Sequence, residues 1–197
     1  RLTDDAGQPL TLDGQGNGSF KDYVLAGILR SAQGRLDAGE DLSSLDWLRV
    51  EDGKATAADF DKLAAFRTRM KSAPAFDSVT LGTPENQLFG AADMSERHFT
   101  DFSCAHSLVN GAKADRLQVD MMNPMHYIGD PQAAVAGHYR IRHGSVDRDT
   151  SLAISAMLTA KLRMNGVDVT LEYPWGVPHS GDYDLPELFA WIDSICK

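Results

Sequence analysis

The feature that most constrains the fold is an alternation of strand and helix patterns in the last third of the chain. Residues 138–142 are a short strand candidate, and residues 167–173 alternate as a strand does. Each is followed by a stretch with apolar side chains at helical spacing, residues 151–163 and residues 185–195. Strand, helix, strand and helix joined by short links are typical of a parallel sheet covered by helices. The sequence therefore predicts an α/β fold here.

Two parallel strands do not make a complete sheet, because both edges keep unpaired backbone groups. The chain also starts at Arg1 rather than Met, with neither the apolar core of a signal peptide nor a strand. We therefore expect it to be the downstream part of something longer. Residues 124–197 are predicted to form the α/β part, and residues 1–123 a mainly helical and irregular part.

The first part of the chain contains fewer regular patterns. Ser19 and Thr56 are expected to cap the first two helices, because a short hydroxyl side chain can accept hydrogen bonds from free amides there. Residues 39–53, between these helices, are predicted to form turns. Helices are predicted, in chain order, at 20–36, at 57–71, near 115–122 and after Asp130-Pro131.

Composition narrows the classes of function. The chain has 19 Lys and Arg residues against 28 Asp and Glu residues, a formal charge of −9. This acidic balance argues against general nucleic-acid binding, which relies on clustered Lys and Arg. No apolar run approaches the roughly 18 residues that a membrane-spanning helix needs. Cys104 and Cys196 make neither a disulfide framework nor a metal site. We expect no nucleic-acid and no membrane partner.

Polar side chains with catalytic potential follow both predicted strands. Asp147 and Asp149 come just after the first strand, and His179 comes just after the second. The carboxyl ends of parallel strands lie at one edge of a sheet, so these loops can bring a carboxylate and an imidazole together. A carboxylate that accepts from one ring nitrogen fixes the tautomer and leaves the other nitrogen as a base. The order acid, then histidine is that of α/β-hydrolases after their nucleophile.

Simpler roles compete with this interpretation. An aspartate before a helix is more often only a cap, and Asp149 suits that role better than Asp147, since Thr150 and Ser151 begin the helix. A histidine in a loop rich in Pro and Gly is usually solvated. The other histidines show neither the H-x-x-x-H nor the H-E-x-x-H spacing, so we expect no metal.

Two motifs resemble the C-terminal end of bacterial tannases. They are HGSVDRDTS at 143–151 and WGVPHSGDYD at 175–184, the second followed by ELFAWI. The resemblance extends upstream to KSAPAFD at 71–77 and PENQLFG at 84–90, and so covers most of the chain from about residue 60 onward. Tannases are α/β-hydrolase-fold esterases with a large lid inserted between strands.

The resemblance implies a division of the chain as well as a fold. Residues 124–197 would be the C-terminal portion of an α/β-hydrolase core, and residues 1–123 a mainly helical lid or cap. The family's serine lies in a G-x-S-x-G elbow, which this sequence does not contain. Ser19 follows Gly18, but Phe20 comes next and no strand-to-helix turn is visible. The serine and the rest of the core are therefore expected upstream or on a companion chain.

The resemblance also implies roles for five residues. Asp147 and His179 match the acid and base of the Ser–His–Asp triad. Lys71, Glu85 and Asp149 match the residues that hold the hydroxyls of a galloyl ring. Carboxylates accept from phenolic hydroxyls and an ammonium donates to them, and such a site rejects rings that lack those hydroxyls. Taken alone, Lys71 and Glu85 belong to residue types that mostly lie solvated on surfaces.

The implied function is a serine esterase that releases gallate from galloyl esters and needs no cofactor. Its partners would be a galloyl ester or gallate and a companion N-terminal polypeptide that carries the serine. Two alternatives stay open, a feruloyl or other hydroxycinnamoyl esterase and a non-catalytic protein that binds phenolic ligands. The sequence is compatible with a secreted, a periplasmic or a cytoplasmic location.

Overall fold

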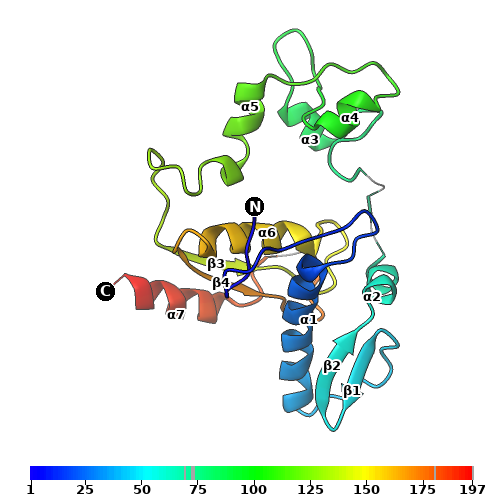
Figure 1. The fold of residues 1–197 in the computed structure, drawn as a ribbon, viewed down its shortest axis with the longest axis vertical. Helices are drawn as coiled ribbons and strands as arrows, with labels where there is room; N and C mark the ends of the chain where they lie inside the picture. The colour runs from blue at the N-terminus through cyan, green and yellow to red at the C-terminus, as the bar shows by residue number, and fades with distance from the viewer. Residues whose placement is uncertain (69, 72–73, 180, 197) are drawn as a thin grey trace. The chain divides into compact units, whose positions relative to one another are not determined.

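The structure is a computed structural model that describes residues 1–68, 70–71, 74–179 and 181–196. The chain divides into two compact units (Figure 1). Unit 1 consists of Arg1–Arg69 and Ala136–Lys197, and unit 2 consists of Met70–Val135. Unit 2 is thus an insertion in the sequence of unit 1. The predicted lid of residues 1–123 and core of residues 124–197 follow different bounds, and that assignment stays a prediction.

Unit 1 contains the predicted α/β pattern, and its four elements are confirmed (Figure 1). The two strands pair in parallel, with His138 opposite Asp168 at the start of the register. Parallel strands need a long crossover, which the helix between them supplies. Ser151 caps that helix by accepting from the Ala153 amide at 3.3 Å. The elements are β3 (His138–Arg142), α6 (Leu152–Arg163), β4 (Asp168–Glu172) and α7 (Leu185–Ile195).

The first helix, α1 (Ser19–Asp37), belongs to the core of unit 1. Gly27 of α1 meets the Tyr173 ring just after β4, where an added Cβ would lie 2.3 Å from a ring carbon. Burying an aliphatic side chain such as Ile28 contributes about 1.5–3 kcal/mol. The apolar cluster holds the end of β4 in place and consists of Val24, Leu25, Ile28, Trp47, Leu63, Leu152, Ala156 and Tyr173.

The predicted cap of α1 is wrong by one residue. Gly18 is the N-cap, and its φ of 142° lies in the region that favours glycine. The Ser19 hydroxyl instead accepts from the Thr11 amide at 3.0 Å and donates to the Pro9 carbonyl at 3.2 Å. It therefore anchors the irregular N-terminal arm.

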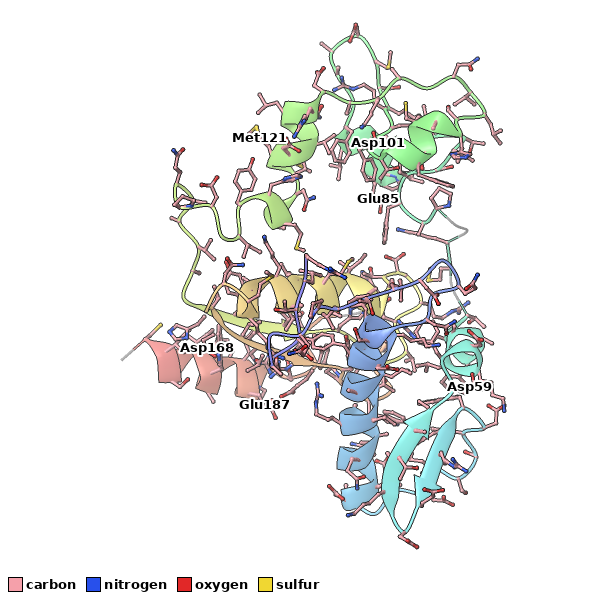
Figure 2. All side chains as sticks on the ribbon, viewed as in Figure 1. Asp59, Glu85, Asp101, Met121, Asp168 and Glu187 are labelled. Carbon is pink, nitrogen blue, oxygen red and sulfur yellow. The ribbon has the colours of Figure 1, made fainter. Side chains whose placement is uncertain are left out.

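The predicted helix over 57–71 with Thr56 as its cap is wrong in its first part, and the helix also ends earlier than predicted, at Arg67. Thr56 lies in a β-hairpin of β1 (Leu48–Glu51) and β2 (Lys54–Ala58), whose strands are antiparallel. Asp52 and Gly53 both have positive φ between the strands, which is the geometry of a tight hairpin turn. The helix, α2 (Phe60–Arg67), begins after Asp59, whose carboxylate accepts from two amides of the first turn (Figure 2). The turn prediction for residues 39–53 therefore missed a strand.

Unit 2 consists of short helices joined by irregular segments. The helix predicted near 115–122 is confirmed, whereas the helix predicted after Asp130-Pro131 is wrong, because that segment forms turns. The elements are α3 (Pro84–Leu88), α4 (Asp101–Ala105), α5 (Arg116–Met121) and a 3₁₀ turn η1 (Pro124–His126).

A buried carboxylate organises unit 2. Asp77 is 2 % exposed, and its Oδ1 accepts from Asn86 Nδ2 at 2.8 Å and lies 2.8 Å from His98 Nδ1. Its Oδ2 accepts from the Phe99 amide and from both the amide and the hydroxyl of Thr100. Burial raises the pKa of Asp77, but these hydrogen bonds outweigh it and hold the pKa below its ordinary value. An ionised side chain thus joins segments of a unit that contains only short helices.

Three further features concern membrane-spanning segments, cysteines and the last helix, in the part of the chain that the structure describes. Within it, none of the helices combines the length and the apolar composition of a membrane-spanning segment. Cys104 and Cys196 are both free thiols. No described residue of α7 is buried, and Phe189 on this helix is 59 % exposed.

Candidate active site

The loops that follow β3 and β4 bring Asp147 and His179 together. His179 Nδ1 lies 3.0 Å from Asp147 Oδ2, which is hydrogen-bonding distance. The carboxylate is buried, whereas the side chain of His179 is 62 % exposed. The proximity expected from the parallel sheet is therefore present, and the catalytic roles stay predictions.

Gly144 allows the two loops to approach this closely. A Cβ on Gly144 would lie 2.1 Å from the Val177 carbonyl oxygen, a separation that no side chain permits. Hydrogen bonds join the loops on either side of this contact. The Ser145 amide donates to the Pro174 carbonyl at 3.0 Å, and the Gly176 amide donates to the Ser145 hydroxyl at 2.8 Å. The HGS segment of the first motif therefore positions Asp147 against His179.

The environment of Asp147 keeps its carboxylate ionised. Its Oδ1 accepts from the Asp149 amide at 2.8 Å and from the Thr150 amide at 3.0 Å. Burial raises the pKa of Asp147, but these amides and the His179 ring outweigh it and hold the pKa below its ordinary value. Arg67 of α2 donates to the backbone carbonyl of Asp147. The loop is thus held by both its side chain and its main chain.

The expectation that Asp149 suits the capping role better than Asp147 is wrong. Ser151 caps α6, and Asp147 accepts from the amides that precede the helix. The Asp149 carboxylate is partly exposed and accepts from the Thr150 hydroxyl at 3.4 Å. Asp147 therefore combines the local role of an Asx turn with its contact to His179.

Sequence reasoning missed a second imidazole on the same carboxylate. His143 Nε2 lies 3.2 Å from Asp147 Oδ2, and the ring is 7 % exposed. Its place at the end of β3, four residues before Asp147, is the signal that could have indicated it. An open cavity of unit 1 is lined by Arg142, His143, Gly144, Asp147, Thr150, Pro178, His179 and Gly181.

Lys71 and Glu85 form an ion pair in unit 2, with Lys71 Nζ 3.0 Å from Glu85 Oε1. The ammonium also lies 4.4 Å from the centre of the Phe76 ring. Glu85 stands in the first turn of α3 (Figure 2), after the capping residue Thr83. Burial raises the pKa of Glu85, but its own amide and Lys71 outweigh it and keep the pKa below its ordinary value.

One oxygen of Glu85 is left without a partner. Glu85 Oε2 is buried and has no hydrogen-bond partner among the described residues. An unsatisfied buried acceptor costs about 1–3 kcal/mol, and more when it is charged. A hydroxyl of a bound molecule would remove that cost. Of the three residues predicted to hold a ring, Lys71 and Glu85 lie in unit 2, and Asp149 lies in unit 1.

Unit 2 contains a hydrogen-bonded series of a carboxylate, an imidazole and a hydroxyl that sequence reasoning did not find. His98 Nδ1 faces Asp77, and His98 Nε2 lies 2.9 Å from the Ser107 hydroxyl. His98 is fully buried, and the Ser107 oxygen already accepts from the Gly111 amide at 2.9 Å. A Cβ on Gly111 would lie 2.8 Å from His98 Nε2, so the backbone packs directly on the ring. The His98 ring is therefore inaccessible to a substrate, and this series of hydrogen bonds is structural.

Among the residues that the structure describes, no group of three or more His, Cys, Asp or Glu side chains is placed to hold a metal ion. The site is instead a buried carboxylate on Nδ1 of an exposed imidazole, at the carboxyl edge of a parallel sheet. This is the arrangement of the acid and base in α/β-hydrolases, and the parallel unit fits that fold.

Comparison with solved structures identifies the family to which the chain belongs. It is 41% identical to a tannase from Lactobacillus plantarum, with a TM-score of 0.94, over all of this chain and 42% of that chain. It is 44% identical to a Fusobacterium nucleatum tannase, with a TM-score of 0.87, over all of this chain and 42% of that one. The chain belongs to the bacterial tannase family and spans less than half the length of these relatives.

A tannin acyl hydrolase related to this chain has been solved with 3,4-dihydroxybenzoate and with ethyl gallate. Each of these structures is 41% identical to this chain, covers all of it and is matched over 43% of its own length, with TM-scores of 0.94 and 0.93. No protein-family model matches the chain, and no curated protein sequence matches it.

Proposed function

We propose that this chain is the lid and C-terminal part of a serine esterase that hydrolyses galloyl esters. The observation that carries the proposal is the 3.0 Å contact between Asp147 Oδ2 and His179 Nδ1 in a chain of the tannase family. The chain has no G-x-S-x-G segment and corresponds to about 42% of the L. plantarum tannase chain. We therefore assign the nucleophilic serine to a segment or companion polypeptide outside these residues.

In the proposed mechanism the imidazole of His179 moves a proton twice. Its Nε2 takes the proton of the serine hydroxyl while that oxygen attacks the ester carbonyl, and it then gives the proton to the departing alcohol or phenol. Water then attacks the acyl-enzyme while His179 accepts its proton, and the imidazolium returns that proton to the serine oxygen as the acyl–serine bond breaks and gallate leaves. Asp147 keeps the proton of the ring on Nδ1 and stabilises the imidazolium in each step. The reaction needs no cofactor.

The galloyl ring is proposed to bind through Lys71, Glu85 and Asp149. The unpartnered Glu85 Oε2 supports this role, because a phenolic hydroxyl would donate to it. The Lys71 ammonium, held on Glu85 Oε1, would donate to a neighbouring hydroxyl of the ring. The dihydroxybenzoate and ethyl gallate complexes of a related tannin acyl hydrolase support a phenolic ligand.

The test is hydrolysis of methyl gallate by this chain together with the polypeptide that carries the serine. We expect His179→Ala to lower kcat by a factor on the order of 10⁴ or more. The matched control is His138→Ala, which removes another histidine paired with a carboxylate, at 2.8 Å from Asp168, and should leave turnover unchanged. Wild-type turnover in His179→Ala would end the proposal.

Methyl ferulate separates the two acyl specificities. A galloyl esterase should prefer methyl gallate, whereas a clear preference for methyl ferulate would identify a hydroxycinnamoyl esterase instead. A complex that binds gallate tightly but neither turns over an ester nor reacts with a fluorophosphonate would be the non-catalytic protein.

A further inference from the structure

His143 is a buried imidazole that the proposed mechanism leaves without a role. Its Nε2 faces two acceptors, Asp147 Oδ2 at 3.2 Å and the Thr150 carbonyl at 3.3 Å. Its Nδ1 lies 2.8 Å from the Ser155 hydroxyl on α6. Because a nitrogen that faces two acceptors must carry a proton, Nε2 is the donor of this ring.

The partner at Nδ1 agrees with a neutral ring. The Ser155 hydroxyl can donate either to His143 Nδ1 or to the Leu152 carbonyl at 3.1 Å. When the single proton of a neutral imidazole is on Nε2, Nδ1 carries a lone pair that accepts from Ser155. Burial lowers the pKa of His143, and the charge of Asp147 only partly offsets it, so the neutral form is favoured. Ser155 therefore selects the tautomer whose protonated Nε2 donates to the Thr150 carbonyl and also lies 3.2 Å from Asp147 Oδ2.

We propose that His143 is a positioning residue that shares Asp147 Oδ2 with His179 and so limits how strongly this carboxylate attracts the imidazolium. Both imidazoles meet the same oxygen, at 3.2 Å from His143 and 3.0 Å from His179. The Oδ1 atom is already held by two backbone amides. His143 is thus not needed to orient the carboxylate, and its effect falls on the oxygen that holds His179.

The other charged and titratable groups around this cluster do not take its place. Arg67 approaches from α2 but donates to backbone carbonyls of Asp147 and Thr150. Tyr173 meets the His143 ring edge-on at 6.1 Å, and burial raises its pKa to about 12, so it is neutral. Asp149 lies in the same loop, and Arg142 lines the same cavity.

His143 should also affect catalysis, through the basicity of His179. Only this consequence rests on the proposed function. A carboxylate that gives all of Oδ2 to one imidazole stabilises the charged form of that ring more than a shared one does. Removing the donor at position 143 should therefore raise the pKa of His179. A merely structural role would have no such effect, and a displaced carboxylate would have the opposite one.

The test compares His143→Phe, which keeps a ring but has no donor, with His143→Gln, whose amide can donate to Oδ2. The titration of His179 is followed by NMR in the 197-residue chain. We expect its pKa to rise by about half a unit in the Phe variant and to return close to the unmodified value in the Gln variant. His138, which pairs with Asp168 at 2.8 Å, is the internal control and should not change. An unchanged or lowered His179 pKa in a folded Phe variant would overturn the proposal.

A second measurement needs no variant. The ¹⁵N shifts of the His143 ring in the unmodified chain should report a protonated Nε2 and an unprotonated Nδ1. A proton on Nδ1 of the neutral ring would refute the proposal even if the Phe variant did not fold.

Both NMR measurements are independent of turnover. If the NMR results are as expected but the complex does not hydrolyse esters, the proposed function is wrong and the inference of a shared carboxylate stands. In an active complex, the acid limb of kcat/KM should move to higher pH in His143→Phe and return in His143→Gln. An acid limb that stays in place while His179 titrates higher would contradict the link to catalysis.

Discussion

Among the described residues, two buried aspartates each contact an imidazole through its Nδ1, and the exposure of the ring distinguishes the two pairs. Asp77 holds His98 at 2.8 Å inside unit 2, where the ring is fully buried. Asp147 holds His179 at 3.0 Å, with the His179 side chain 62 % exposed. Both carboxylates have pKa values below the ordinary range because hydrogen bonds outweigh burial. Only the exposed ring can exchange a proton with a substrate.

At the scale of single residues, Glu85 allows a test of the proposed ring site. Glu85→Ala removes a carboxylate oxygen that has no partner among the described residues. We expect the KM for methyl gallate to rise roughly 10-fold or more, since a hydrogen bond to a charged group contributes about 1.5–3 kcal/mol. The KM for methyl ferulate should change much less. The control is Glu51→Ala in the exposed strand β1, and an unchanged KM for methyl gallate would remove Glu85 from the proposed ring site.

At this scale the sequence was informative only where the chemistry left a local pattern. Asp147 and His179 could be paired because each follows a strand of one parallel sheet. Lys71 and Glu85 depended on resemblance alone. The Asp77–His98 contact joins residues in irregular segments 21 positions apart, and nothing in the local sequence signals it.

At the scale of elements, the part of the chain after residue 137 was predictable and the hairpin was not. The strands and helices of unit 1 after residue 137 follow regular apolar spacing with clear caps and stops. The hairpin of β1 and β2 is short and mostly exposed, so its strands have little apolar alternation. The Asp52-Gly53 pair was the available signal, and Asp59 rather than Thr56 was the helix cap.

Gly144 provides the prediction for the contact between the two loops. Gly144→Ala places a Cβ 2.1 Å from the Val177 carbonyl, so the loops must separate. We expect a loss of about 1–3 kcal/mol in the free energy of unfolding, measured by chemical denaturation, with a loss of ester hydrolysis. Gly34→Ala is the matched control, because a Cβ there meets nothing within 4 Å in the helix α1. That variant should be stabilised by up to about 1 kcal/mol, and equal effects of both changes would contradict the argument.

At the scale of the whole molecule, the two units are stabilised differently. Unit 1 has a cluster of apolar side chains between α1, α6 and the end of β4. Unit 2 is built around the buried carboxylate of Asp77 and its hydrogen-bond donors. The stability of unit 2 should therefore depend more on pH.

The sign of that dependence follows from the lowered pKa of Asp77. Its contribution is present above the unfolded pKa of about 3.9 and is lost as pH falls through the lower folded value. We expect amide hydrogen exchange to show unit 2 protected at neutral pH and opening in strong acid. Asp77→Asn should destabilise unit 2 already at neutral pH, because hydrogen bonds to the buried carboxylate, each contributing about 1.5–3 kcal/mol, are lost or weakened.

Asp93→Asn is the control for this experiment, because Asp93 is an exposed carboxyl in the same unit. Its exchange pattern should match that of the unmodified chain at every pH. Normal protection of unit 2 at neutral pH in Asp77→Asn would show that the carboxylate is not its organising group.

The chain leaves unit 1 after α2 and re-enters it before β3, so unit 2 occupies one continuous stretch of sequence. A gene arranged in this way can exchange that stretch as a single cassette, with two junctions and no change to the loops that carry Asp147 and His179. Lys71 and Glu85, two of the residues proposed to bind the aromatic ring, belong to this stretch and would be exchanged with it. New acyl preferences could then evolve by recombination while the residues proposed to transfer the proton are inherited unchanged.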